Sequence, residues 1–315
     1  MATKTGVVTA SVLNLRAEPL SSSSLLGTLA RGTRVTILET SGAWYRVQAG
    51  DQNGFVHGDF VKILDTDHAA GFLNERDDLK NVPLEPSEAE KIQTKASFNG
   101  TQKLAAQTWN NQGGLLGALS EIVEVDPAAA VAVLCVESSG RGFGDDGRMI
   151  IRFENHVFWD KWGKANADDF NCHFRYNASK KWLGHQFCEA KGGSWSDCHK
   201  SQTDEWRVFG FARKLDEPSA IRSISMGGPQ VMGFNHHLVG YETPREMFDN
   251  FQADLRWQVI GLFDFVKGSG TTSPMLQALQ RRRFDDFATR YNGPGQAAEY
   301  GGRIQKFYEA FEGLR

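Results

Sequence analysis

Residues 126–140, Asp-Pro-Ala-Ala-Ala-Val-Ala-Val-Leu-Cys-Val-Glu-Ser-Ser-Gly, decide how the larger part of this chain folds. Asp126 followed by Pro127 favours a helix start, because Asp caps the first turn and proline is tolerated at the first helical position. Residues 128–136 are apolar on every side, so we expect this helix to be buried. It ends with one carboxylate, Glu137, just before a Ser-Ser-Gly sequence that stops a helix.

A carboxyl group at the end of a buried apolar helix loses hydration, which raises its pKa. A Glu that keeps its proton near neutral pH is able to act as a general acid. The alternative is that Glu137 is exposed to water or paired with Arg141. The helix alone does not decide between the two, and the segments that follow favour the catalytic interpretation.

A hairpin is expected directly after this helix. The turn-rich residues 142–147 lead into Arg148-Met-Ile-Ile-Arg-Phe-Glu154, which is typical of a strand. The hairpin therefore adds a second carboxylate, Glu154, beside the helix. Asp145 and Asp146 are further candidates for a second acid, but their place in the sequence is typical of turn residues.

Two later segments add polar groups. Residues 225–235, Ser-Met-Gly-Gly-Pro-Gln-Val-Met-Gly-Phe-Asn, predict a glycine-rich turn that presents the side-chain amide of Gln230. Residues 291–295, Tyr-Asn-Gly-Pro-Gly, predict the end of a helix, with Tyr300 and Arg303 following.

The first part of the chain, residues 5–64, predicts an all-β domain. Short alternating segments are separated by turn residues, as in half-buried strands; they are Gly6–Ala10, Arg34–Leu38, Trp44–Val47 and Gly54–Val56. Trp44 and Tyr45 are neighbours in one strand, so one of them faces outward. Either residue is therefore a candidate platform for a ligand, and the other fills the core.

The order and spacing of five motifs in this part resemble the bacterial SH3-like domain family. They are Leu13–Pro19, Leu26–Leu29, Gly32–Val35, Trp44–Val47 and Gly54–His57. The resemblance implies a small barrel that binds cell-wall peptidoglycan, often at its peptide stems.

The remainder of the chain is similar to goose-type lysozymes and lytic transglycosylases, and more closely to the N-acetylmuramidase family of phage endolysins and bacterial lysins. The motifs are Glu-Ser-Ser-Gly at 137–140, Gly-Gly-Pro-Gln-Val-Met-Gly at 227–233 and Tyr-Asn-Gly-Pro-Gly at 291–295, in this order. Further matching residues are Arg148–His156, Gly184-His185, Glu205-Trp206 and 222–235.

This resemblance implies a lysozyme-like helical fold in which Glu137 protonates the glycosidic oxygen between N-acetylmuramic acid and N-acetylglucosamine. It also implies that the sugar is contacted by Ser138, Gln230, Tyr291 and Asn292. With Glu154 as the second carboxylate, a separation of about 5 Å from Glu137 predicts retention, and about 6.5–9.5 Å predicts inversion. A Glu without such a partner fits a lytic transglycosylase, in which the muramic acid's own hydroxyl closes an anhydro ring.

The expected organisation is a β-domain at 5–64, a linker at 65–85 and a mainly α (α+β) lysozyme-like catalytic domain at 86–315. A capping box at 87–90 predicts the first helix. Thr243-Pro244 predicts another, with an amphipathic pattern over 248–266. Ser273-Pro274 opens a further helix, which carries aromatic residues as far as Tyr291.

An insertion at 170–200 is crowded with potential metal ligands: Cys172, His173, His185, Cys188, Cys198 and His199. Zinc needs about four such ligands, so a structural site or a zinc peptidase deserves consideration. The insertion lacks both Cys-x-x-Cys and His-Glu-x-x-His spacing, so we assign no metal ligand. A zinc site, a Cys188–Cys198 disulfide and free thiols all stay open, while Cys135 in the apolar helix is expected in the core.

The amino-acid composition limits the classes of partner that the chain is expected to bind. The 35 Lys and Arg against 38 Asp and Glu give a net charge of −3, which argues against a general nucleic-acid binder. The longest apolar run, 128–136, is too short to cross a bilayer. No signal-peptide core is visible near the first residues, so for action on the wall from outside the cytoplasm we expect either export or release by another route or a leader that has been removed. We expect a monomeric peptidoglycan hydrolase without a cofactor; the alternatives are a lytic transglycosylase and a non-catalytic wall-binding protein.

Overall fold

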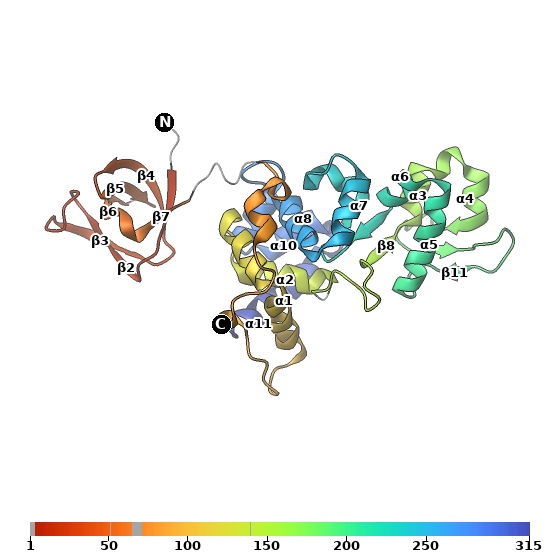
Figure 1. Ribbon diagram of the computed structural model, residues 1–315, viewed down its shortest axis with the longest axis horizontal. Coiled ribbons are helices and arrows are strands. Elements are labelled where there is room, and N and C mark those ends of the chain that lie inside the picture. Colours follow the sequence, from red (N-terminus) through yellow and green to blue (C-terminus); the bar gives the residue numbers. More distant parts are fainter. Residues whose placement is uncertain (1–3, 51, 65–70, 139) are drawn as a thin grey trace. The chain divides into compact units, whose positions relative to one another are not determined.

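The computed structural model describes residues 4–50, 52–64, 71–138 and 140–315 (Figure 1). The chain divides into two compact units, residues 1–70 and 71–315. The first is a β-sheet unit and the second is mainly helical, so the predicted fold class is confirmed. Within the described residues, no helix has the length and apolar character to span a membrane.

The first unit is one seven-stranded antiparallel sheet with the order β3-β2-β6-β5-β4-β1-β7. The strands are β1 (Lys4–Val8), β2 (Val12–Arg16), β3 (Leu25–Ala30), β4 (Arg34–Ser41), β5 (Trp44–Ala49), β6 (Gln52–His57) and β7 (Val61–Leu64). Alternate residues of the strands point inward, and Leu15, Val47 and Val56 at the centre are completely buried.

The second unit contains eleven α-helices among its described residues. They are α1 (Gly100–Val123), α2 (Pro127–Ser138), α3 (Asn155–Lys161), α4 (Ala167–His173), α5 (Gln202–Leu215), α6 (Glu217–Arg222), α7 (Pro244–Ala253), α8 (Leu255–Lys267), α9 (Pro274–Gln280), α10 (Phe284–Tyr291) and α11 (Ala297–Glu312). Two small antiparallel sheets accompany them. One joins β13 (Val231–Met232), β12 (Ile224–Met226) and β8 (Ile151–Phe153), and the other joins β11 (Ser196–Asp197), β10 (Gln186–Phe187) and β9 (Phe174–Arg175).

The helical unit has two hydrophobic cores, and Trp257 packs against both. The first surrounds α2 and is built from α1 and α8–α11, whereas the second lies around β8 and β12 with α3–α7 (Figure 1). Residues 128–136 of α2 are at most 5% exposed. The predicted buried helix is therefore confirmed, and its start is capped by Asp126, whose Oδ1 accepts from the Ala128 N–H at 3.0 Å.

The helix expected from Ser87 is only a single 3-10 turn, Glu88–Glu90, although its capping box is present. The chain that follows is held instead by side chains of α1. Asn110 exchanges hydrogen bonds with both backbone groups of Ile92, and the Trp109 indole donates to the carbonyl of Glu90. These contacts replace the intrahelical bonds that a longer helix would have made.

Two expected helices are each divided. The pattern over 248–266 spans α7 and α8, because Asp254 leaves the helical conformation and caps α8 through the Arg256 N–H. The helix from Pro274 stops before α10, because Arg282 adopts a left-handed backbone with φ of 56°.

The predicted linker at 65–85 is wrong for its second half. Residues 65–70 lie outside the described residues, but Leu73 and Leu79 are buried in the core around α2. Asp264 of α8 accepts from the backbone N–H groups of Leu73 and Asn74 at 2.6 and 3.0 Å. Leu73 and Leu79 supply the apolar surface that packs residues 71–85 against the helical unit. The composition of this segment is typical of a linker and does not indicate that contact.

Candidate active site

Glu137 lies in the last turn of α2, and its carboxyl group is partly shielded from water. The Asn292 side-chain amide donates to Glu137 Oε1 at 3.3 Å. Burial raises the pKa of Glu137 to about 7, and the Asn292 hydrogen bond and the Arg303 charge only partly oppose this. The group therefore keeps its proton to a higher pH than an exposed Glu does.

The end of α2 is held by residues of α1. Gly140 has a left-handed backbone with φ of 70°, and its N–H donates back to the carbonyl of Leu134. The Gln112 amide donates to the Gly140 carbonyl at 2.8 Å, and a side chain at Gly140 would overlap the Thr108 hydroxyl. The turn after Glu137 thus requires glycine. Ser138 is the last residue of α2, and its side chain lies outside the described part of the chain.

Tyr291 and Asn292 come from the end of α10. The Tyr291 hydroxyl donates to the carbonyl of Pro229 at 2.8 Å, and its ring stacks on Phe287. This bond joins α10 to the glycine-rich turn at 227–230. Asn292 uses its amide nitrogen on Glu137, while its Oδ1 is buried without a hydrogen-bond partner. The oxygen is a free acceptor next to the candidate acid.

The side-chain amide of Gln230 forms hydrogen bonds within its own loop. Its Nε2 donates to the carbonyl of Gly227 at 2.7 Å, and its Oε1 accepts from the Ser225 hydroxyl at 2.8 Å. These two bonds hold a backbone with φ of 52° at Gln230. The structure therefore shows Gln230 shaping the turn, and contact with a sugar stays a prediction.

Gln258, which the sequence analysis did not single out, and Arg303, which follows the 291–295 segment, also build this site. Gln258 is completely buried on α8, accepts from the Gly228 N–H at 2.8 Å and donates to the Phe251 carbonyl. Its polar side chain on an otherwise apolar helix face was a usable signal. Arg303 of α11 donates to the carbonyl of Val136 at 3.3 Å, with its guanidinium over the Tyr300 ring.

Glu154 has a different set of neighbours. Arg152 Nε donates to its Oε1 at 2.9 Å, and Nδ1 atoms of His156 and His185 both lie 3.4 Å from its Oε2. Burial alone would raise the pKa of Glu154, but His156, His185 and Arg152 together lower it. Among the described residues, Glu154 is not one of the groups that shift the pKa of Glu137. Its role as second carboxylate stays a prediction.

Asp145 and Asp146 are bound within the hairpin turn. Asp145 pairs with Arg141, and Asp146 accepts from the backbone and the guanidinium of Arg148. Both act as turn residues in this structure.

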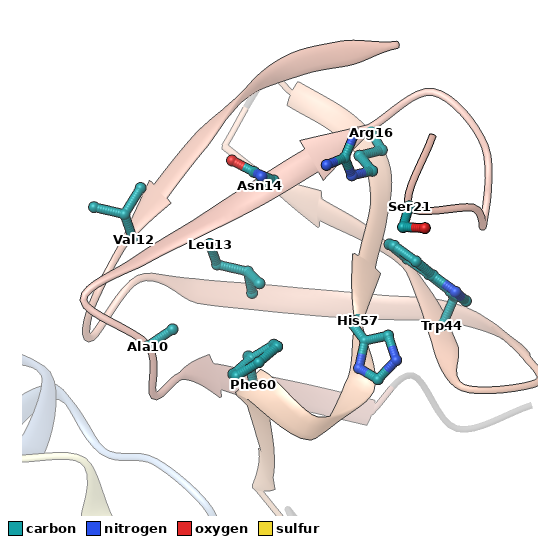
Figure 2. A pocket seen from close by; sticks show the side chains of 9 residues that line it. All are labelled: Ala10, Val12, Leu13, Asn14, Arg16, Ser21, Trp44, His57 and Phe60. Atoms are coloured by element: carbon teal, nitrogen blue, oxygen red, sulfur yellow. The ribbon is translucent and has the colours of Figure 1, made fainter. Parts of the chain in front are cut away.

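In the first unit, Trp44 and Tyr45 have different surroundings. Tyr45 packs against the hydrophobic core. Trp44 lies in a surface pocket of about 290 Å³, with its ring 5.2 Å from that of His57 (Figure 2). The pocket is lined by Ala10, Val12, Leu13, Asn14, Arg16, Ser21, Trp44, His57 and Phe60. Of the two candidate platforms, Trp44 is the one placed where a ligand has access.

The four cysteines are all free, so the Cys188–Cys198 disulfide is not formed. Cys188 Sγ donates to the carbonyl of Ala190, and Cys198 Sγ lies 3.7 Å from Asn155 Oδ1. Cys135 is buried in the core, as expected, beside the Thr108 hydroxyl.

Comparisons with known proteins cover both units. A family model described as N-acetylmuramidase matches residues 126–312, and one described as bacterial SH3 domain matches residues 11–62. Among solved structures, the crystal structure of the Burkholderia AP3 phage endolysin is similar, with 24% sequence identity, 62% of this chain and 70% of that chain covered, and a TM-score of 0.49. No curated protein matches the chain.

Proposed function

The chain belongs to the N-acetylmuramidase family, and on that premise we propose that Glu137 is the general acid that cleaves the bond between N-acetylmuramic acid and N-acetylglucosamine. The protein is a glycoside hydrolase that acts on peptidoglycan, with a bacterial SH3 domain as its wall-binding part. The identity of the acid and of the bond is our proposal.

The observation that carries the proposal is the environment of the Glu137 carboxyl group. Its pKa of about 7 lets it hold a proton at neutral pH and transfer it to the glycosidic oxygen as the bond breaks. The Asn292 amide and the Arg303 charge favour the carboxylate that remains after the transfer. Asn292 Oδ1, which has no partner, offers an acceptor to a sugar hydroxyl or to a water molecule.

Which group attacks the muramic acid carbon of the cleaved glycosidic bond depends on whether a second carboxylate takes part. We keep Glu154 as the predicted second carboxylate, since its lowered pKa leaves it ionised, as a nucleophile or a general base requires. Among the described residues, no carboxylate contributes to the pKa shift of Glu137. If no second carboxylate takes part in the reaction, attack by the substrate's own hydroxyl is the alternative, and the enzyme is then a lytic transglycosylase.

For the SH3 unit we propose that the Trp44 pocket is the contact with the wall. Its apolar and aromatic lining, together with Asn14 and Arg16, suits a peptide stem or a sugar face. Holding the chain on the wall raises the effective concentration of the catalytic unit near its substrate.

The deciding experiment is digestion of purified peptidoglycan, with the soluble products identified by mass spectrometry. Fragments ending in a reducing muramic acid are expected, and anhydro-muramic ends would establish transglycosylation. Release of free peptides alone, or of nothing, would contradict a muramidase.

The matched variants are Glu137→Gln and Glu189→Gln, the latter an exposed carboxyl group in the 170–200 insertion. We expect Glu137→Gln to lose on the order of 10²–10⁴-fold in rate, and Glu189→Gln to retain the wild-type rate. Equal activity of the two variants would remove Glu137 from the mechanism.

A further inference from the structure

Glu154, His156 and His185 form a cluster of potential metal ligands in the lobe built around β8. Glu154 precedes α3, His156 lies in its first turn, and His185 precedes β10. Their atoms Oε2, Nδ1 and Nδ1 all lie within 4.8 Å of one another. Residues from two separate stretches of the chain therefore converge on one point.

All three atoms are buried and none has a hydrogen-bond partner. A buried polar atom without a partner costs free energy, so three of them facing one another require an explanation. Both nitrogen-to-oxygen distances are 3.4 Å, which leaves the pairs outside good hydrogen-bond geometry.

The lack of a hydrogen-bond partner is most costly at His185, because its side chain is completely buried. Its Nε2 lies 2.7 Å from the carbonyl of Lys181 and must carry a proton to donate there. In the neutral ring, Nδ1 then presents a lone pair toward Glu154 Oε2, which also carries lone pairs. A cation between these atoms would turn the repulsion into three favourable contacts.

The surrounding residues do not occupy the three atoms that could bind a metal ion. Arg152 occupies Oε1 of Glu154, so Oε2 remains available. The His199 ring lies 4.9 Å from that of His185, and its Nδ1 bonds Glu205 Oε1 at 2.7 Å. Carboxylates orient metal-binding histidines in this way, and the His199 Nε2 is itself buried without a partner.

We propose that Glu154 Oε2, His156 Nδ1 and His185 Nδ1 bind a zinc ion that fastens the 170–200 insertion to the start of α3. Two imidazole nitrogens and one carboxylate oxygen form a donor set that zinc accepts in tetrahedral sites, with the fourth position left to water. The cysteines that suggested zinc in the sequence are not members of this group. The site gives Glu154 a role that competes with that of second carboxylate, and it does not depend on Glu137.

The test uses the full chain without an affinity tag, stripped of metal and then titrated with zinc chloride by calorimetry. We expect one zinc per chain and a higher melting temperature with zinc than without it. Glu154→Gln and His156→Asn, chosen because these side chains are less buried than that of His185, should weaken binding at least tenfold.

His237→Asn, an exposed histidine outside the cluster, is the matched control and should bind zinc as the wild type does. The proposal is overturned if the folded wild-type chain binds no stoichiometric zinc, or if Glu154→Gln and His156→Asn bind it as tightly as the control. Zinc binding is read without any cleavage assay, so its failure and a failure of the Glu137 assignment are distinguishable.

Discussion

At the scale of single residues, two opposing effects set the chemistry of Glu137. Removal from water favours its neutral form, while the Asn292 hydrogen bond and the Arg303 charge favour its ionised form. Removal from water is the larger effect, so the pKa rises from 4.5 to about 7.

The first prediction concerns the pH dependence of cleavage. Because the acid must be protonated, kcat/KM should fall as the pH rises through about 7. Asn292→Ala removes a hydrogen bond that lowers the pKa of Glu137, so this limb of the profile should move to higher pH. The measurement is the pH–rate profile of both proteins, with Asn250→Ala on α7 as control; a limb that stays in place or moves lower would contradict the assignment.

The second prediction concerns stability. A carboxyl group whose pKa is higher in the folded than in the unfolded chain destabilises the fold as it ionises, with the cost absent below pH 4.5 and complete above about 7. Glu137→Gln cannot ionise, so its stability relative to wild type should improve by about 3 kcal/mol between pH 4 and pH 8. Denaturant unfolding at both pH values tests this, and a difference that is independent of pH would show that Glu137 is not desolvated.

At the scale of elements, the pleat of β5 separates two neighbouring aromatic residues. Tyr45 lies against the core, and Trp44 lies beside His57 in the surface pocket. Removal of the Trp44 side chain and removal of the Tyr45 side chain are therefore expected to have different effects on the protein.

The third prediction follows from this difference. Trp44→Ala should weaken binding to purified cell walls about tenfold, the equivalent of roughly 1.4 kcal/mol, with its melting temperature unchanged. Tyr45→Ala should mainly lose stability, by about 2 kcal/mol. Sedimentation with cell walls and thermal unfolding measure the two effects, and Leu38→Ala is the control at an exposed apolar side chain. Wild-type wall binding by Trp44→Ala would exclude the pocket.

At the scale of the whole molecule, the boundary of the catalytic unit lies at residue 71. Lys267 donates to the carbonyl of Gly71, and Asp264 binds the backbone of Leu73 and Asn74. A fragment that begins at residue 86 leaves the completely buried Asp264 without these donors and removes Leu73 and Leu79 from the core.

The fourth prediction compares two fragments, 71–315 and 86–315. The shorter should lose about 4 kcal/mol or more from two missing buried leucines, which lowers the melting temperature by roughly 10 °C in a unit of this size. Fragment 71–315 should cleave short soluble glycans as the full chain does, but should be slower on intact walls, because it lacks the wall-binding unit. Equal melting temperatures for the two fragments would show that residues 71–85 are part of the linker, as the sequence predicts.

Local patterns in the sequence were sufficient for some of the elements. Asp126-Pro127 followed by nine consecutive apolar residues predicts a buried helix, so α2 follows from residues 126–140, whereas the shielding of Glu137 does not. Short alternating segments identified four of the seven strands of the first unit, β1, β4, β5 and β6, in the same way. Each of these signals lies within one stretch of chain, which is why it is readable without the fold.

Other features depend on contacts between distant segments, and only the tertiary structure decided them. Residues 71–85 look like a linker until α8 supplies Asp264, and the choice between Trp44 and Tyr45 depends on which face of β5 the sheet closes over. Glu154 and His156 meet His185 only because the 170–200 insertion folds back onto the start of α3. A sequence places ligand types along a chain, but their convergence on one point is set by packing, and no local pattern records it.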